Sequence, residues 1–166
     1  MHVMWSEPMG EHSFYRVNWT GGTRRVPVTD TKINVTGLTA GVHYSFTVVA
    51  VAKDNSTESD TAEISHYTKP GIIGLHNVSS NTSSISLRWP APPGQVFMYR
   101  LEWHDGGGLS LTTVPNTFAV LSELTSGTNH NITIFAVAGD NKTQGDPYTF
   151  TSFTSKLHYL LSTSAD

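Results

Sequence analysis

Apolar and polar residues alternate along most of this chain, in short runs separated by glycine, proline and asparagine. Tyr15, Val17 and Trp19 share one side of the run 13–19, and the residues between them fall on the other side. The run 44–52 likewise begins with an apolar or aromatic residue at every second position. A period of two is typical of β-strands that bury one face, so the pattern predicts an all-β protein.

One sequence pattern occurs twice in the chain. Residues 38–50 read LTAGVHYSFTVVA and residues 124–136 read LTSGTNHNITIFA, an offset of 86 residues (124 − 38). Trp5 returns as Trp89, at an offset of 84 (89 − 5). Self-similarity at one period indicates tandem modules. We therefore predict a first module at 1–69, a second at 70–154, and a tail or the start of a further module at 155–166.

Each copy divides into short strands wherever turn residues interrupt the alternation. In the first copy we predict strands at 2–6, 13–19, 23–28, 32–36, 44–52 and 61–67. In the second we predict seven strands, at 72–76, 83–89, 96–103, 109–114, 117–121, 129–138 and 147–153. The second copy has two more residues between Trp103 and Leu124 than the first copy has between Trp19 and Leu38. We place these two residues in the glycine turn 106–108.

The first copy begins inside the counterpart of the second predicted strand of the second copy. We therefore expect it to lack its first strand and to leave a sheet edge unpaired, which favours pairing with another chain. The tail 155–166 alternates at Leu157, Tyr159 and Leu161, so a strand-pairing dimer through this truncated edge is one hypothesis. The linker 68–71 is short and contains Pro70, which favours tight coupling of the modules.

Composition narrows the functional classes. The 166 residues carry a net charge of −3, and the sequence pI is about 6.2, so nucleic-acid binding is not expected. No apolar run reaches the ~20 residues that a membrane-spanning helix needs, so we expect no direct membrane contact in this fragment. The first five residues lack the pattern of a signal peptide, and we interpret Met1 as an introduced start.

Sequons for N-glycosylation are dense, and they point outside the cell. Seven of the nine asparagines begin Asn-x-Ser/Thr, and no middle residue is proline. Ser/Thr-rich sequences also produce such triplets by chance. The absence of cysteine alone would fit the cytosol, but the sequons favour a secreted or cell-surface chain. The predicted acceptors, and hence an expected set of N-glycans, are Asn18, Asn34, Asn55, Asn77, Asn81, Asn131 and Asn141.

No motif in the sequence predicts catalysis, a cofactor or a metal. The eight histidines are scattered without the close spacing of zinc ligands. There is no cysteine nucleophile, phosphate-binding loop or dinucleotide fingerprint. Arg24 and Arg25, with Lys32, form the only basic cluster. Its residues either contact acidic glycans or protect an exposed edge, and the second reading is the more usual one.

The repeated residues resemble a fibronectin type III module, over about 150 of the 166 residues. The resemblance combines a Trp near the end of the second strand, a Tyr in the third strand, and Leu-x-x-Gly-x-x-Tyr before a long strand. It implies two tandem seven-stranded immunoglobulin-like β-sandwiches, the first N-terminally truncated, with Tyr44 as a tyrosine corner and His130 departing from it. The structural core residues that it implies are Trp5, Tyr15, Leu38, Tyr44, Trp89, Tyr99, Leu124 and His130.

A narrower resemblance is to the ectodomains of receptor-type protein tyrosine phosphatases with one catalytic domain and many repeats. It rests on NVSSNTSSISLRW at 77–89 and on the turns at 38–44 and 124–130. It implies a non-catalytic extracellular fragment of a single-pass plasma-membrane receptor, a spacer and protein-recognition module whose protein partner the sequence does not name. The alternatives are a module of a matrix or adhesion protein and an accessory linker domain of a secreted glycoside hydrolase.

Overall fold

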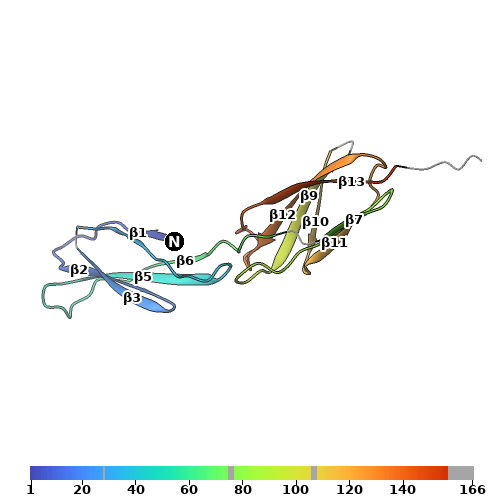
Figure 1. Cartoon of the computed structure of the whole chain (residues 1–166). Coiled ribbons are helices and arrows are strands. Elements are labelled where there is room, and N and C mark those ends of the chain that lie inside the picture. The colour runs from blue at the N-terminus through green and yellow to red at the C-terminus, as the bar shows by residue number, and fades with distance from the viewer. Residues whose placement is uncertain (28, 75–76, 106–107, 157–166) are drawn as a thin grey trace, which may run out of the picture.

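The computed structural model describes residues 1–27, 29–74, 77–105 and 108–156, apart from the side chain of Arg25. The described residues form thirteen strands, arranged as two β-sandwiches that follow each other end to end (Figure 1). They contain no helix, and so none long and apolar enough to cross a membrane. The all-β prediction is therefore confirmed. We call the sandwich of β1–β6 module one and that of β7–β13 module two.

Module one has a two-stranded and a four-stranded sheet. β1 (His2–Met4) pairs with β4 (Lys32–Asn34). The larger sheet has the order β3-β2-β5-β6, and every neighbouring pair is antiparallel. Its strands are β2 (Phe14–Trp19), β3 (Gly22–Pro27), β5 (His43–Val51) and β6 (Ala62–Tyr67).

Module two has the same larger sheet and one more strand in the smaller one. The smaller sheet has the order β11-β8-β7 and the larger one the order β10-β9-β12-β13. The seven strands are β7 (Asn77–Ser80), β8 (Ile85–Arg88), β9 (Met98–Asp105), β10 (Gly108–Val114), β11 (Phe118–Leu121), β12 (Asn129–Val137) and β13 (Tyr148–Phe153).

The first strand of module two was predicted at 72–76, and that position is wrong. Residues 72–74 form no strand, residues 75–76 lie outside the described part, and β7 begins at Asn77. Asn77 lies opposite Arg88, the last residue of β8. Pro90 follows two positions later and has no N–H to donate, so β8 offers no ladder to residues 72–74.

The other predicted strands are found, with ends that differ by at most two residues. The predicted strand end at Val28 and the alternation at 157–161 lie outside the described residues. The prediction for the glycine turn needs correction. Gly22 lies opposite Trp19, whereas Ser110 lies opposite Trp103, an offset of 88 (110 − 22). Because Trp19 and Trp103 are only 84 apart, the β9–β10 hairpin has four extra residues rather than two. The connection to β11 is correspondingly shorter, since Ile33 and Ala119 are again 86 apart.

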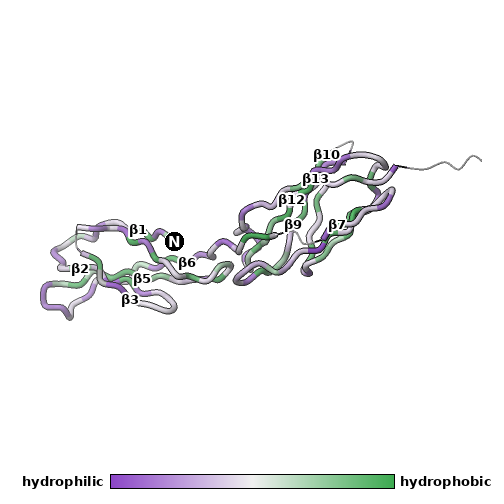
Figure 2. The backbone as a smooth tube through the Cα atoms, viewed as in Figure 1, coloured by the Kyte–Doolittle hydropathy of each residue, from purple (hydrophilic) through white to green (hydrophobic). Residues whose placement is uncertain are grey.

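The alternating side chains form one core in each module. Figure 2 shows the apolar positions along the strands and the polar ones concentrated in the connections. Trp5 meets Tyr15 edge to face with ring centroids 5.2 Å apart, and Trp89 meets Tyr99 in the same way, also at 5.2 Å. This arrangement is one that aromatic pairs favour.

The core of module one is the less completely covered of the two. In module two, β7 pairs with β8, and Ile73 and Val78 pack against the core. Among the described residues nothing pairs with the outer edge of β1. Trp5 is consequently half-buried, whereas Trp89 is buried, and Leu38 is half-buried, whereas Leu124 is buried.

Candidate functional site

Tyr44 forms a tyrosine corner in module one, in which its hydroxyl bonds back to the turn that precedes β5. Its buried hydroxyl accepts a hydrogen bond from the Thr39 backbone N–H at 3.0 Å. The Thr68 hydroxyl donates to the Thr39 carbonyl at 2.6 Å, which ties the turn to the end of β6. Gly41 adopts φ +70° between them, a conformation that glycine reaches without a steric penalty. These bonds fix the turn between β4 and β5.

Module two builds the same turn with different side chains. His130 occupies the position of Tyr44 and is 1% exposed, but the Thr125 N–H is bonded to the Asp105 carboxylate at 3.2 Å. The Nε2 atom of His130 lies 2.9 Å from the Thr128 hydroxyl, and its Nδ1 atom lies 3.4 Å from the His104 carbonyl oxygen.

The lengthened β9–β10 hairpin therefore supplies two partners that module one lacks. His104 and Asp105 lie beyond Trp103, and Trp19 of module one is already at the turn of its shorter hairpin. Sequence reasoning missed Asp105. The two extra residues that the repeat shows between Trp103 and Leu124, together with the loss of the corner Tyr, were the signal that could have found it.

Most of the predicted glycan acceptors lie at the surface. Asn18 is half-buried, and its amide lies 3.5 Å from the Thr47 hydroxyl. Asn81 is exposed, and its side-chain oxygen accepts from the backbone N–H groups of Ser83 and Ser84. The other acceptors are also exposed and are Asn34, Asn55, Asn77, Asn131 and Asn141.

Two of the sequons also have a structural role in their turns. Asn55 and Asn141 adopt φ +59° and +58°, a left-handed conformation that asparagine tolerates well. The residue before each is an aspartate whose carboxylate accepts hydrogen bonds from the backbone N–H and hydroxyl of the sequon threonine. The backbone bond from Thr143, with the neighbouring donors, lowers the pKa of Asp140 to about 2, and the Thr57 hydroxyl leads a similar lowering of the Asp54 pKa.

The two modules meet through direct backbone contact. The Gln95 N–H of module two donates to the Ala40 carbonyl of module one at 2.9 Å. A Cβ atom added to Gly41 would lie 1.8 Å from the Gln95 carbonyl oxygen, and one added to Gly94 would lie 2.3 Å from the Ala40 carbonyl oxygen. No side chain fits between these turns, so both positions require glycine.

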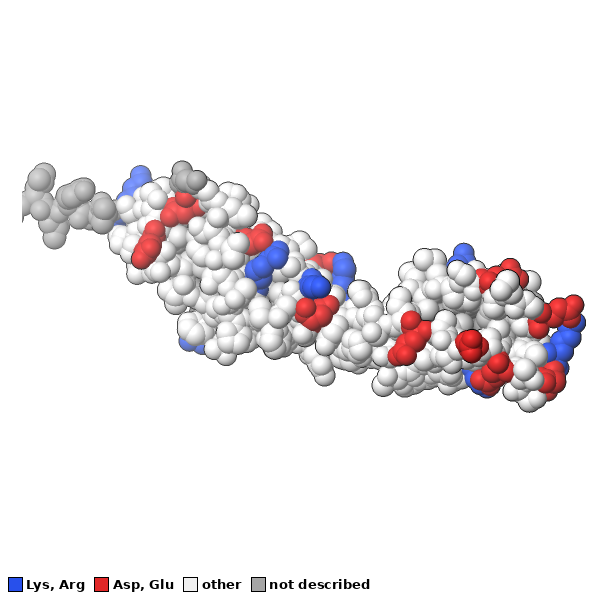
Figure 3. All heavy atoms as spheres, turned by 180° about the vertical axis from the view of Figure 1, so that it is seen from behind, with Lys and Arg blue, Asp and Glu red and all other residues white. Residues whose placement is uncertain are grey.

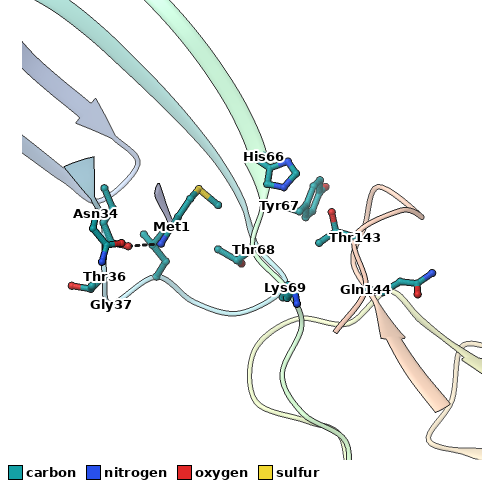
Figure 4. Close-up of a pocket in the computed structure, with 12 residues that line it drawn as sticks. Met1, Asn34, Thr36, Gly37, His66, Tyr67, Thr68, Lys69, Thr143 and Gln144 are labelled. Atoms are coloured by element: carbon teal, nitrogen blue, oxygen red, sulfur yellow. Dashed lines mark hydrogen bonds between the residues drawn. The ribbon is translucent and has the colours of Figure 1, made fainter. Parts of the chain in front are cut away.

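Side chains extend this junction on either side of the linker. The Lys69 ammonium lies 3.1 Å from the Asp146 carboxylate in an exposed ion pair. A Cβ atom on Gly139 would lie 2.9 Å from the Tyr67 hydroxyl, so the Tyr67 side chain reaches module two. Beside them lies an open groove of about 830 Å³, which Figure 4 shows between Met1 and the 34–37 turn on one side and Thr143 and Gln144 on the other.

Charged side chains and possible metal ligands are dispersed among the described residues. In the ranges given above, no group of three His, Asp or Glu side chains could hold a metal ion. Arg24 and Lys32 line a shallow hollow together with Asp30, whose negative charge offsets one of the two positive charges. Figure 3 shows the charged residues of one face in small groups of mixed sign.

Comparison with known proteins agrees with this geometry. The family model described as "Fibronectin type III domain" matches residues 1–65 and 68–151. Receptor-type tyrosine-protein phosphatase eta of Gallus gallus is 36% identical over 149 residues, which is 86% of this chain and 10% of that protein. Chitinase A1 of Niallia circulans is 31% identical over 128 residues, which is 71% of this chain and 18% of that protein.

A solved structure has the same tandem arrangement. The two fibronectin type III domain segment from chicken tenascin matches with a TM-score of 0.62 at 24% identity, over 92% of this chain and 91% of that one. That likeness concerns the fold. The chain spans only a tenth to a fifth of the length of the two curated relatives. Because the family model covers most of the sequence in two successive matches, the chain belongs to the fibronectin type III family.

Proposed function

We propose that this chain is a non-catalytic extracellular segment of a cell-surface receptor resembling a receptor-type tyrosine phosphatase. Its role is that of a spacer that holds neighbouring modules at one angle and presents their surfaces to a protein partner. The observation that carries the proposal is the junction. There the Ala40–Gln95 hydrogen bond and the glycine-only contact between the two turns leave little freedom between the modules.

An extracellular setting is supported by two further observations. Six of the seven sequon asparagines are exposed, as acceptors of a glycan must be. The chain is also 36% identical to part of a protein named as a receptor-type phosphatase. The phosphatase reaction itself would belong to another part of such a protein, because this segment has no cysteine.

The junction is tested by measuring distances between the modules. The chain has no cysteine, so Met9→Cys and Ser122→Cys, both at exposed positions, would be its only two thiols. Spin labels at these sites should give one narrow distance distribution by double electron–electron resonance. A flexible Gly-Ser insertion after Pro70 provides the control, and its distribution should be broad. A native distribution as broad as that of the control would refute the spacer proposal.

The cellular setting has a separate test. The chain should be secreted from mammalian cells behind an added signal peptide, and the occupancy of each sequon should be mapped by mass spectrometry. We expect glycans on the exposed acceptors and the least modification at Asn18, whose side chain is half-buried. A chain secreted without glycans would contradict the cell-surface proposal and leave the junction result intact.

A further inference from the structure

One side of module two has an unusually apolar surface. Residues 108–121, which form β10 and β11, contain no charged residue. They expose four large apolar side chains. Leu109 (56% exposed) and Leu111 (64%) face outward from the larger sheet, and Phe118 (45%) and Val120 (51%) face outward from the smaller one. The corresponding stretch of module one, 20–35, contains Arg24, Arg25, Asp30 and Lys32.

Both strands are at the edges of their sheets. β10 is the last strand on one side of the β10-β9-β12-β13 sheet, and β11 is the last strand of the β11-β8-β7 sheet. Only three residues connect Val114 to Phe118, so the two edges lie on the same side of the sandwich. An edge strand presents unpaired N–H and C=O groups, and natural proteins usually protect it with charges, bulges or a covering segment.

Module one protects its equivalent edge and module two does not. Across the hairpins, Arg24 and Arg25 of β3 correspond to Thr112 and Thr113 of β10, at the offset of 88 given above. β10 is seven residues long and reads GLSLTTV, a sequence of high β propensity. It has the length and composition of a strand that pairs with another chain.

The predicted glycan acceptors lie off the β10 and β11 edges, and the acceptor of the larger sheet, Asn131 on β12, is two strands away from β10. No sequon begins between residues 82 and 130. Those of module two begin at Asn77 on β7, at Asn81 in the next turn, at Asn131 on β12 and at Asn141 in the β12–β13 connection. Neither β10 nor β11 contains an acceptor.

We propose that β10 is the docking edge for a second copy of this chain. Two copies of β10 pair antiparallel about a two-fold axis and join their larger sheets into one continuous eight-stranded sheet. With the axis at Leu111, the two Leu111 side chains face each other, and Leu109 faces Thr113 of the other copy on the same side of the sheet. The edge carries no charge, so self-pairing places no like charges opposite each other.

A second copy fits this edge better than a charged partner does. An acidic or basic segment would lose hydration against β10 without gaining an ion pair, because β10 has no charged residue. Leu109 and Leu111, the two exposed apolar side chains on the face that the paired strands share, fall far short of the ~800 Å² per partner of a standard interface, so we expect a weak dimer, with a dissociation constant above about 10 µM.

Sedimentation equilibrium of the unglycosylated full chain tests this proposal. The weight-average mass should rise above the monomer mass of 18.1 kDa as the concentration increases towards about 1 mM. Thr113→Arg copies the residue of module one into β10 and should weaken association at least tenfold. Leu111→Thr copies Thr23 and removes the apolar contact without adding charge, so it should weaken association as well.

Two control variants locate the contact. Thr151→Arg places the same charge on β13, the opposite edge strand of the same sheet, and should dimerise like the native chain. Met4→Lys alters the exposed edge of β1 and should do likewise. Circular dichroism melts would verify that every variant is folded.

The proposal is overturned if the native chain stays at the monomer mass throughout this range. It is also overturned if folded Thr113→Arg and Leu111→Thr associate as the native chain does. Loss of association in Met4→Lys alone would move the contact to the β1 edge. The result is independent of the receptor proposal, because it concerns a surface within module two and not the junction or the glycans.

Discussion

Gly41→Ala should uncouple the two modules while leaving both folded. Gly41 lies in the corner turn of module one at φ +70°, and its backbone touches Gln95 of module two. A Cβ atom there would lie 1.8 Å from the Gln95 carbonyl oxygen, whereas ordinary contact begins at 3.4 Å. The two turns must therefore separate by about 1.6 Å, the difference between these two distances.

This separation carries an energetic cost that can be worked out. Moving Gln95 by this amount away from the turn lengthens its 2.9 Å hydrogen bond to Ala40 beyond bonding range, which costs about 1 kcal/mol. An alanine in the left-handed region costs about 1–2 kcal/mol more. A Gly37→Ala variant separates the cost of the left-handed alanine from the cost of the lost hydrogen bond. The φ of Gly37 is +74°, nearly that of Gly41, and a Cβ atom at Gly37 would have nothing within 4 Å.

The assay combines chemical denaturation with the spin-label distances between the modules. Gly37→Ala should lower the free energy of unfolding of module one by about 1–2 kcal/mol and keep the narrow distance distribution. Gly41→Ala should lower it by about 1 kcal/mol more and broaden the distribution. If Gly41→Ala keeps the native distribution, the backbone contact does not set the angle between the modules and the reasoning fails.

Three further predictions concern the turns and the cores. Tyr44→Phe should cost module one about 1 kcal/mol in urea denaturation, because it removes the corner hydrogen bond, and Asp105→Ala should cost module two about 1–2 kcal/mol for the same reason. The Asp140 carboxylate has a pKa of about 2, below the ~3.9 expected when unfolded, so its contribution is complete above about pH 4 and is lost as the pH falls towards 2. Asp140→Asn should therefore melt at a lower temperature than the native chain at pH 6 and at nearly the same temperature at pH 2. Trp89→Ala should cost module two about 3–5 kcal/mol, and Trp5→Ala should cost module one less, because Trp5 is only half-buried.

Each of these predictions has an outcome that would contradict it. An Asp105→Ala chain as stable as the native one would show that the carboxylate does not replace the corner hydroxyl. A constant difference between Asp140→Asn and the native chain from pH 6 to pH 2 would remove the titration argument. A loss in Trp5→Ala equal to that in Trp89→Ala would mean that the third strand of the smaller sheet in module two does not strengthen its core.

Much of each strand could be predicted because burying one face imposes a period of two. Tyr15, Val17 and Trp19 alternate for that reason, and their counterparts in module two repeat the pattern. Sequence reasoning failed where a partner strand decides the outcome. Residues 72–76 were predicted as a strand, but β8 ends at Arg88 and offers no ladder to residues 72–74.

The substituted corner shows the same limit within the candidate site. The sequence marks His130 as a departure from Tyr44, and the repeat marks a longer stretch before it. The Asp105 carboxylate reaches the Thr125 N–H only because the β9–β10 hairpin extends beyond Trp103. The sequence does not show how far this hairpin extends. Hairpin register is a property of two strands together, so neither strand alone encodes it in a readable form.

The sequence by itself determined the fold class, the two copies and the sequons, because local alternation and exact spacing encode each of them. The tertiary structure decided which groups meet across the chain. The Ala40–Gln95 contact joins turns 55 residues apart (95 − 40), and the exposure of Leu109 and Leu111 follows from the place of β10 at the end of its sheet. These features arise when distant segments pack together, and nothing in the local order of residues specifies them.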